Sequence, residues 1–158
     1  MAQNQTTGRQ PDGSYKAPIG PGSEIAKIND PNGPPSELIG NGQCVTATAH
    51  FSGVTGDTSQ WTPGKPAAQL TDSDKGVAVA TFDNNGKYFP TSSEKNSGIF
   101  NGTSTKDNFH LVDQWPKRTD SNGNVIREAR PPGDRIISPN GAHPSDNSHD
   151  YYVIIVPR

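Results

Sequence analysis

Glycine and proline interrupt this sequence so often that they limit what it can fold into. The 158 residues include 17 glycines and 15 prolines, and both residue types weaken the interior of helices and strands. A run without either residue is therefore informative. The stretch from Cys44 to Phe51 is such a run, and it follows Gly40-Asn41-Gly42 closely. The pattern predicts a flexible turn that ends at Cys44 and a short helix that begins there.

The cysteine at this point is the only one in the chain. At a helix N-terminus, free backbone N–H groups and the helix dipole favour a thiolate, which is the form that a nucleophilic cysteine needs. A small buried thiol is the alternative, because free cysteines are often buried. Cys44 alone does not decide between the two. A single cysteine does exclude an internal disulfide and a cysteine-rich zinc site.

Composition narrows the class of protein further. Apolar residues make up 28% of the chain and the mean hydropathy is −0.80, so we expect one domain with a small core and long loops. The net charge is −2 and the basic residues are scattered along the sequence, which argues against nucleic-acid binding. No apolar run is long enough to span a bilayer.

The polar start of the chain, residues 1–10, has no apolar segment of the Sec type. We therefore expect synthesis in the cytoplasm without a signal peptide, and delivery by other means if the protein acts elsewhere. Residues 1–36 are rich in breakers and are expected to form an extended arm or lid. Residues 37–158 are expected to form the main domain.

The spacing of β-branched and apolar residues predicts strands after the helix. We expect them at residues 76–82, 87–89, 97–100 and 108–115, with an edge strand at 125–128 and a central strand at 151–156. Residues 52–75 are interpreted as a polar connection and residues 130–133 as a bend. The helix should turn Val45, Ala49 and Thr48 inward. One short helix on an antiparallel sheet of five or six strands is an α+β fold.

Several motifs occur in an order that resembles the papain-like cysteine amidases called NlpC/P60 and CHAP. Gly42-Gln43-Cys44 resembles the Gly-Gln-Cys of CHAP domains. More specifically, the chain resembles the type VI secretion amidase effectors of the second class, from about residue 38 to its C-terminus. The matching motifs are Gly40-Asn41-Gly42-Gln43-Cys44-Val45, Trp61 with Gly64, Gly76-Val77-Ala78-Val79-Ala80-Thr81-Phe82, Gly86-Lys87-Tyr88, Gly98-Ile99-Phe100, Val112-Asp113-Gln114-Trp115 and Tyr151-Tyr152-Val153-Ile154.

This resemblance implies an antibacterial toxin that is a peptidoglycan amidase. It would cut the D-alanyl–diaminopimelate bond of peptide crosslinks, without a cofactor. A secretion apparatus would deliver it to the periplasm of a target bacterium, in keeping with the expected absence of a signal peptide. The producing cell would carry a dedicated immunity protein that blocks the site.

The resemblance also assigns roles to residues. Cys44 would be the nucleophile, and its backbone N–H the first oxyanion donor. Gln43 would add a second donor or simply face solvent. Asp113 would orient the base, or would cap a turn at the end of a strand. Trp115 and Trp61 would contact substrate or pack in the core.

The catalytic base is the position where this sequence departs from the family. The resemblance places a histidine just before the strand Gly98-Ile99-Phe100, and the matching residue is Asn96. An amide cannot accept a proton from a thiol. The chain would then be an engineered inactive form, a natural variant without hydrolysis, or an enzyme that uses another histidine.

The other histidines are weak candidates from sequence. His110 lies three residues before Asp113 on an expected strand, so the two face opposite sides unless a bulge intervenes. His50 faces away from Cys44 on the helix, and His143 and His149 lie in a loop. His143, Asp146, His149 and Asp150 match no standard zinc pattern, and we predict no metal site.

We therefore predict a cysteine amidase that is inactive, or nearly so, with Asn96 in the position of the base. A non-catalytic, β-rich module that binds the cell wall or a protein partner is the alternative. The reactivity of Cys44 toward alkylating agents separates the two, because an exposed thiolate reacts quickly and a buried thiol slowly.

Overall fold

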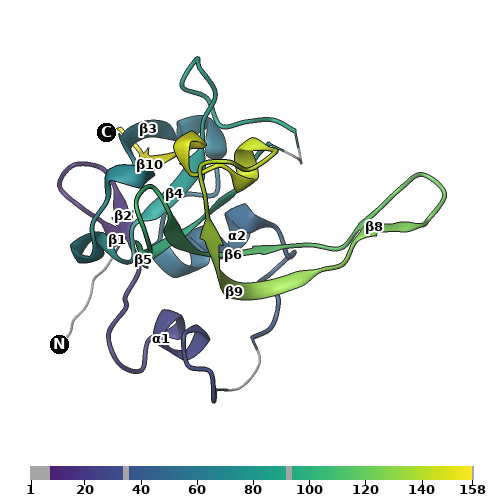
Figure 1. Ribbon diagram of the computed structural model, residues 1–158, viewed down its shortest axis with the longest axis horizontal. Helices are drawn as coiled ribbons and strands as arrows, with labels where there is room; N and C mark the ends of the chain where they lie inside the picture. Colours follow the sequence, from purple (N-terminus) through teal and green to yellow (C-terminus); the bar gives the residue numbers. More distant parts are fainter. Residues whose placement is uncertain (1–7, 34–35, 92–93, 158) are drawn as a thin grey trace.

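Six antiparallel strands form the main sheet of the protein, whose computed structural model describes residues 8–33, 36–91 and 94–157 (Figure 1). Their order across the sheet is β3-β10-β4-β5-β6-β9. Their bounds are Thr62–Pro66, Tyr151–Ile155, Ala78–Thr81, Ser97–Thr103, Phe109–Trp115 and Arg130–Ile137, in that order. The predicted α+β class is confirmed, and the antiparallel sheet, which was expected to have five or six strands, has six.

Alternate residues of the central strands are buried on the two faces of this sheet, as the period-2 geometry of a strand requires. On β4, Ala78 and Ala80 belong to one apolar cluster, and Val79 belongs to the other. The two alanines lie in the same apolar cluster as Ala47 and Phe51, on the face of the sheet that carries a helix. All four residues of β4 are buried, which explains why this strand reads as a nearly continuous apolar run.

Helix α2 (Cys44–Ser52) packs on β5 and β6. It begins at Cys44, as predicted, and ends before Gly53, which adopts the left-handed conformation that terminates many helices (φ 84°). The predicted inward face was partly wrong. Ala47, Thr48 and Phe51 are buried, whereas Val45 and Ala49 lie half-buried at the border of the core.

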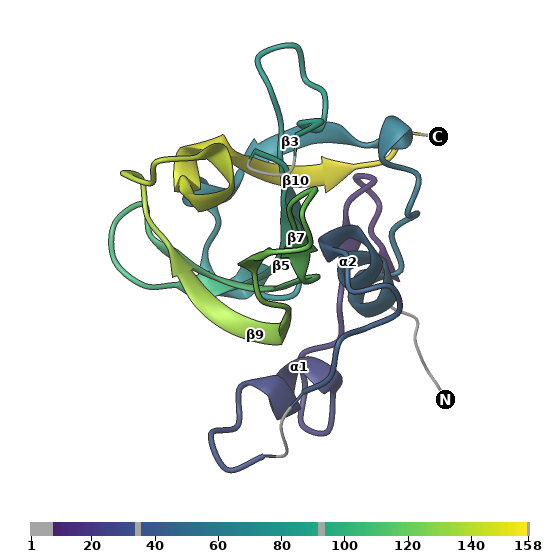
Figure 2. The same ribbon diagram turned by 90° about the vertical axis from the view of Figure 1, so that its right-hand side faces the viewer.

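The breaker-rich N-terminal segment, expected as an extended arm, contains short regular elements: β1 (Gly8–Arg9), β2 (Tyr15–Lys16) and helix α1 (Glu24–Ile28). Ser23 caps α1 by accepting a hydrogen bond from the Ala26 N–H at 3.1 Å. Ala17 and Ile25 are buried in the same cluster as α2. Figure 2 shows α2 against the sheet and α1 below it, toward β9, which α1 contacts. Residues 1–7 and 34–35 of the expected arm lie outside the described residues.

Two expectations about strands were wrong. Residues 62–66 were expected to be part of a connection, but they form the edge strand β3. Residues 130–133 were expected to form a bend, but they begin the other edge strand, β9, which runs to Ile137. The segment expected as a strand at 87–89 contributes a single bridge, between Phe82 and Tyr88. The expected edge strand near 125–128 is β8 (Val125–Arg127), which pairs with β7 (Arg118–Thr119) in a separate hairpin that projects from the molecule (Figure 1).

Short 3₁₀ turns complete the described structure: η2 (Thr58–Gln60), η3 (Ala67–Gln69), η4 (Asp72–Asp74), η5 (Pro144–Asp146) and η6 (Ser148–Asp150). The last two precede β10 and bring the loop around His143 toward the end of the sheet near Cys44. Within the described residues, no helix has the length and apolar character needed to cross a membrane.

Candidate active site

A cavity of about 480 Å³ opens beside the N-terminus of α2. Cys44 and Asn96 both line it, although they come from different elements of the fold. The sheet therefore brings together two of the residues that sequence analysis singled out. The other residues that line the cavity are Gln43, Lys95, Trp115, Pro116, Lys117, Arg118, Arg127, Arg135, His143, Ser145 and Asp146.

The backbone turn before Cys44 is held in place by one buried side chain, Gln114 of β6. Its amide donates to the carbonyl oxygens of Ile39 (3.0 Å) and Gln43 (2.8 Å), and its Oε1 accepts from the Ile39 N–H (2.8 Å). Gln114 is fully buried, so these three bonds cannot be replaced by water. The turn itself needs glycine at position 42, where φ is 84° and an added Cβ would lie 3.3 Å from Pro116 Cβ.

Thr48 ties α2 to the strand that follows Asn96. Its hydroxyl bonds the Cys44 carbonyl oxygen at 2.9 Å and the Ser97 hydroxyl at 2.8 Å. Both hydroxyl groups are buried. The spacing between Cys44 and the start of β5 is therefore fixed by a hydrogen bond as well as by packing.

Asn96 is 5% exposed and uses both of its amide N–H groups within the protein. Its Nδ2 donates to Asp113 Oδ2 and to Tyr151 Oη, each at 2.8 Å. The Tyr151 hydroxyl in turn donates to the carbonyl oxygen of Ser145 at 2.6 Å. Only the carbonyl oxygen of Asn96 remains to meet a molecule in the cavity, and it is an acceptor without useful basicity.

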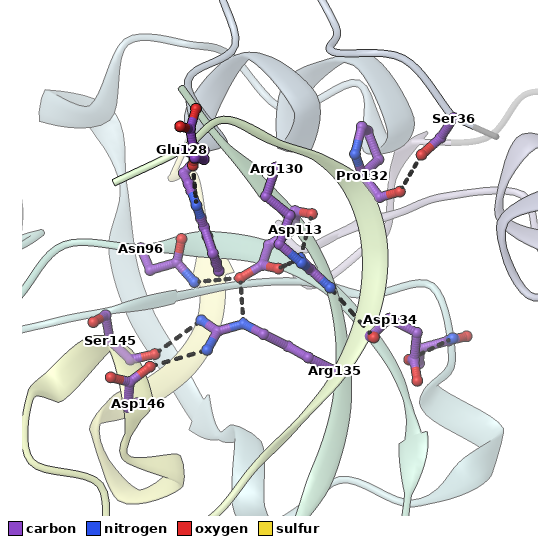
Figure 3. A network of polar contacts seen from close by, with 12 residues as sticks. Ser36, Asn96, Asp113, Glu128, Arg130, Pro132, Asp134, Arg135, Ser145 and Asp146 are labelled. Carbon is purple, nitrogen blue, oxygen red and sulfur yellow. Dashed lines mark hydrogen bonds and ion pairs between the residues drawn. The ribbon is translucent and has the colours of Figure 1, made fainter. Parts of the chain in front are cut away.

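Asp113 is fully buried, and two arginines of β9 compensate its charge (Figure 3). Arg130 Nη1 lies 2.7 Å from Asp113 Oδ1, and Arg135 Nε lies 3.0 Å from Asp113 Oδ2. Arg135 also pairs with Asp146 at 2.9 Å. Burial acts to lower the pKa of Arg135, but the charge of Asp113 and the hydrogen bonds outweigh it, and the pKa lies above its ordinary value.

Among the described residues, Tyr88 lies within hydrogen-bond reach of the Cys44 sulfur, and sequence analysis did not single it out. Its Oη lies 3.5 Å from Cys44 Sγ. Burial and the neighbouring Cys44 raise the pKa of Tyr88 well above its ordinary value, so at neutral pH its hydroxyl keeps its proton and can donate to the sulfur. The only sequence signal at this position was its place in the Gly86-Lys87-Tyr88 motif.

The remaining predicted site residues fall into two groups. Gln43 is exposed and Trp115 half-buried, and both line the cavity. Trp61 does not line it. The Trp61 indole is 3% exposed, donates to the Thr55 carbonyl oxygen at 2.9 Å, and packs edge-on against Tyr88 with ring centres 5.0 Å apart. Trp61 therefore packs against the Tyr88 ring and is not part of the cavity wall.

Of the four histidines, only His143 lines the cavity that contains Cys44. His110 bonds Asp134 at 2.7 Å and lines a different cavity. His50 contacts Glu24 at 2.8 Å on the outer side of α2, and His149 lies 3.6 Å from Asp107. In the described part of the chain, no group of three or more His, Cys, Asp or Glu residues is arranged to hold a metal ion.

This arrangement can supply some parts of amide hydrolysis by cysteine. The thiol lies at the first position of a helix whose N-cap residue, Gln43, makes no side-chain capping bond, so backbone N–H groups are available beside it. A carboxylate is fixed behind position 96. Asn96, which lines the cavity with Cys44 and bonds this carboxylate, carries an amide, and an amide cannot accept a proton from a thiol.

Comparisons with known proteins agree with this geometry at the level of the fold. No family model matches the chain, and neither does any curated protein. Among solved structures, it is similar to type 6 secretion amidase effector 2 (Tae2), with a TM-score of 0.58 and 22% sequence identity. The match covers 78% of this chain and 88% of that chain. The chain shares the fold of Tae2. The relation to NlpC/P60 and CHAP domains stays a prediction.

Proposed function

We propose that this protein is an antibacterial effector of the Tae2 type whose cavity binds the crosslinked peptides of peptidoglycan. The observation that carries the proposal is the grouping of Cys44 and Asn96 around one cavity, with Asn96 bonded to the buried Asp113. This grouping is found in a fold shared with an amidase effector. The bond at the reacting position is the D-alanyl–diaminopimelate amide, as the resemblance of the motifs implies.

In the proposed mechanism the substrate carbonyl lies against the N-terminus of α2. The Cys44 sulfur attacks the carbonyl carbon, and the backbone N–H at the helix start stabilises the oxyanion. A base at position 96, oriented by Asp113, would take the thiol proton and deliver it to the leaving amine. Because Asn96 cannot do either, we propose that the sequence as it stands binds these peptides and hydrolyses them very slowly.

Replacing Asn96 by histidine tests this proposal. A histidine Nδ1–H can replace the bond from Asn96 to Asp113, which leaves Nε2 as a base, and general-base catalysis contributes roughly 10²–10⁴-fold. We expect Asn96→His to release products from purified crosslinked muropeptides at least about 100-fold faster than the unmodified chain. Adding Cys44→Ala to Asn96→His should abolish that gain. Rapid hydrolysis by the unmodified chain would overturn the assignment of Asn96.

If the unmodified chain does hydrolyse muropeptides, His143 is the histidine to examine, because it shares the cavity with Cys44. His143→Ala would then remove the activity, and His110→Ala would not. Under the proposal, neither substitution changes the slow rate of the unmodified chain.

A non-catalytic binding module is the second candidate, and one observation favours it. Both N–H groups of Asn96 are engaged by Asp113 and Tyr151, so the amide fits its position as a structural residue. Muropeptide binding without any gain in hydrolysis from Asn96→His would support this candidate. A secretion apparatus that delivers the protein to the periplasm and an immunity protein that covers the cavity complete the proposal.

A further inference from the structure

The cavity beside Cys44 concentrates positive charge, although the whole chain has a net charge of −2. Five cationic side chains and one carboxylate line it. The carboxylate, Asp146, is already paired with Arg135 at 2.9 Å. The cationic residues are Lys95, Lys117, Arg118, Arg127 and Arg135, which come from separate segments of the sequence. The fold thus gathers charges that appear scattered along the chain.

Two of these cations face each other across the β7–β8 hairpin. Arg118 and Arg127 are direct partners in its ladder, and like charges at directly opposite positions destabilise a strand pair. Burial, together with the charge of Arg118, lowers the pKa of Arg127. An anion placed between the two guanidinium groups would relieve this repulsion.

Arg127 also lacks the partner that its neighbours have. Arg127, Arg130 and Arg135 all lie against Trp115, with guanidinium carbons 4.9, 5.1 and 5.2 Å from the ring centre. Arg130 and Arg135 both bind Asp113. Among the described residues, Arg127 makes no ion pair with a carboxylate, and its buried Nε has no hydrogen-bond acceptor. An unsatisfied buried donor is costly, and a ligand oxygen would satisfy it.

We propose that this cavity binds a carboxylate of the substrate, held by Arg127 and Arg118 beside the Cys44 thiol. A planar guanidinium matches a carboxylate through two parallel hydrogen bonds, and the guanidinium carbon of Arg127 lies over the Trp115 ring, 4.9 Å from its centre. The identification of the substrate as a wall peptide rests on the proposed function, since diaminopimelate carries a carboxylate that is not part of the peptide chain. The charge of the cavity is thus a determinant of specificity.

The single cysteine allows a direct test that needs no catalysis. Iodoacetate and iodoacetamide alkylate the same thiol and differ in that the former carries a carboxylate. We divide the rate of iodoacetate by the rate of iodoacetamide at Cys44, and normalise this ratio to the ratio for free N-acetylcysteine under the same conditions. We expect the normalised ratio to be several-fold above one at low ionic strength. The ratio should fall toward one as salt is added, because salt screens the cations of the cavity.

Substitutions test which residue causes the preference of Cys44 for iodoacetate over iodoacetamide. Arg127→Gln should lower the normalised ratio about threefold to fivefold, the effect of one unit charge at short range in a wet cavity. Arg127→Lys, which keeps the charge, should retain most of the preference. Lys106→Gln is the matched control, because Lys106 is exposed and does not line the cavity. A normalised ratio of one for the unmodified chain, unaffected by salt, would overturn the anion site.

Calorimetry with two peptides separates the anion site from the proposed function. A crosslinked wall peptide with free carboxylates should bind the unmodified chain at least about tenfold more tightly than its amidated form. Arg127→Gln should remove this difference. If the iodoacetate preference is present and neither peptide binds, the wall function is overturned and the anion site stands. Equal binding of both peptides would overturn the role of the carboxylate in recognition.

Discussion

Two pairs of side chains with similar chemistry lie on β6 and its neighbours. Asn96 donates to Asp113 at 2.8 Å, and His110 bonds Asp134 at 2.7 Å. The first pair is buried and adjoins the cavity of Cys44. The second is partly exposed and lines a cavity without a cysteine.

The difference between the pairs shows what a catalytic site needs beyond a hydrogen bond to a carboxylate. The pair that adjoins the cavity of Cys44 has no basic nitrogen, and the pair with a histidine lines a cavity without a cysteine. The pairs also differ in the number of charged groups that bind the carboxylate. Asp113 receives two guanidinium groups in addition to Asn96, whereas Asp134 receives a histidine and Asn101. We expect the buried pair to dominate stability and the exposed pair to contribute little.

Asp113→Asn should have the largest effect on stability. It leaves the guanidinium groups of Arg130 and Arg135 without their shared anion, and breaking a buried ion pair costs about 3–5 kcal/mol. Urea denaturation should show a loss of this size. Asp134→Asn is the matched control and should cost less than about 1 kcal/mol. Similar losses in both variants would show that the two pairs are equivalent after all.

Gln114→Leu tests whether the side chain next to Asp113 on β6 holds the turn before Cys44 in place. The substitution leaves the Ile39 N–H without its acceptor and removes one of the two hydrogen bonds that the carbonyl oxygens of Ile39 and Gln43 each accept, which should cost about 2 kcal/mol in the free energy of unfolding. It should also change the rate at which iodoacetamide alkylates Cys44, because the turn before the helix loses its support. Gln60→Leu, at an exposed position, should change neither quantity. An unaltered alkylation rate in Gln114→Leu would show that packing alone holds the turn.

The buried pair should also make the protein sensitive to alkaline pH. Burial raises the pKa of Tyr151, which accepts a hydrogen bond from Asn96. Below about pH 10 the tyrosine is protonated in the folded and the unfolded chain, and above it the unfolded chain loses the proton first. Stability therefore falls as pH rises, by up to about 1.4 kcal/mol per pH unit for one tyrosine. Denaturation of Tyr151→Phe between pH 9 and 11 should show a shallower decline, and an equal slope would contradict this origin.

His110→Gln should have the smallest effect. The His110–Asp134 pair is partly exposed, and such pairs contribute about 0.5 kcal/mol. Added salt should reduce even this difference, because it screens exposed charges. Muropeptide hydrolysis by Asn96→His should be the same with or without the additional His110→Gln substitution. A loss of that hydrolysis would show that the His110–Asp134 pair contributes to the reaction, although it lines a different cavity.

The central elements of the fold were predictable from sequence because they are periodic and free of breakers. The helix that begins at Cys44 and the strands β4, β6 and β10 fall in this class, and β5 was recognised from Ile99 and Phe100 although it contains Gly98 and Gly102. β3 and β9 were missed because they contain Pro63 and Pro66, and Pro131 and Pro132. Both are edge strands, where a residue without an N–H is tolerated on the side that faces no neighbouring strand.

The candidate site was predictable only where a motif carried it. Cys44 was singled out because it begins a run without glycine or proline, and Asn96 and Asp113 stood at positions that the resemblance supplied. Tyr88 follows a turn, and no pattern in the sequence relates it to a cysteine 44 residues earlier. Arg130 and Arg135 lie on a strand that was not recognised, so their pairing with Asp113 could not be anticipated. Scattered charges become a cluster only after the strands are placed side by side.

The position of β10 has a consequence for how the chain folds. β10 (Tyr151–Ile155) lies between β3 and β4, strands that precede it by more than 60 residues, and it pairs with both. Arg9 and Gly13 also bond the backbone of Val156. During synthesis, β3 and the N-terminal hairpin must therefore wait until β10 has left the ribosome. Such long-range pairing is typical of slow folding, and the earlier strands stay without this partner while the roughly 70 residues between β4 and β10 are being made.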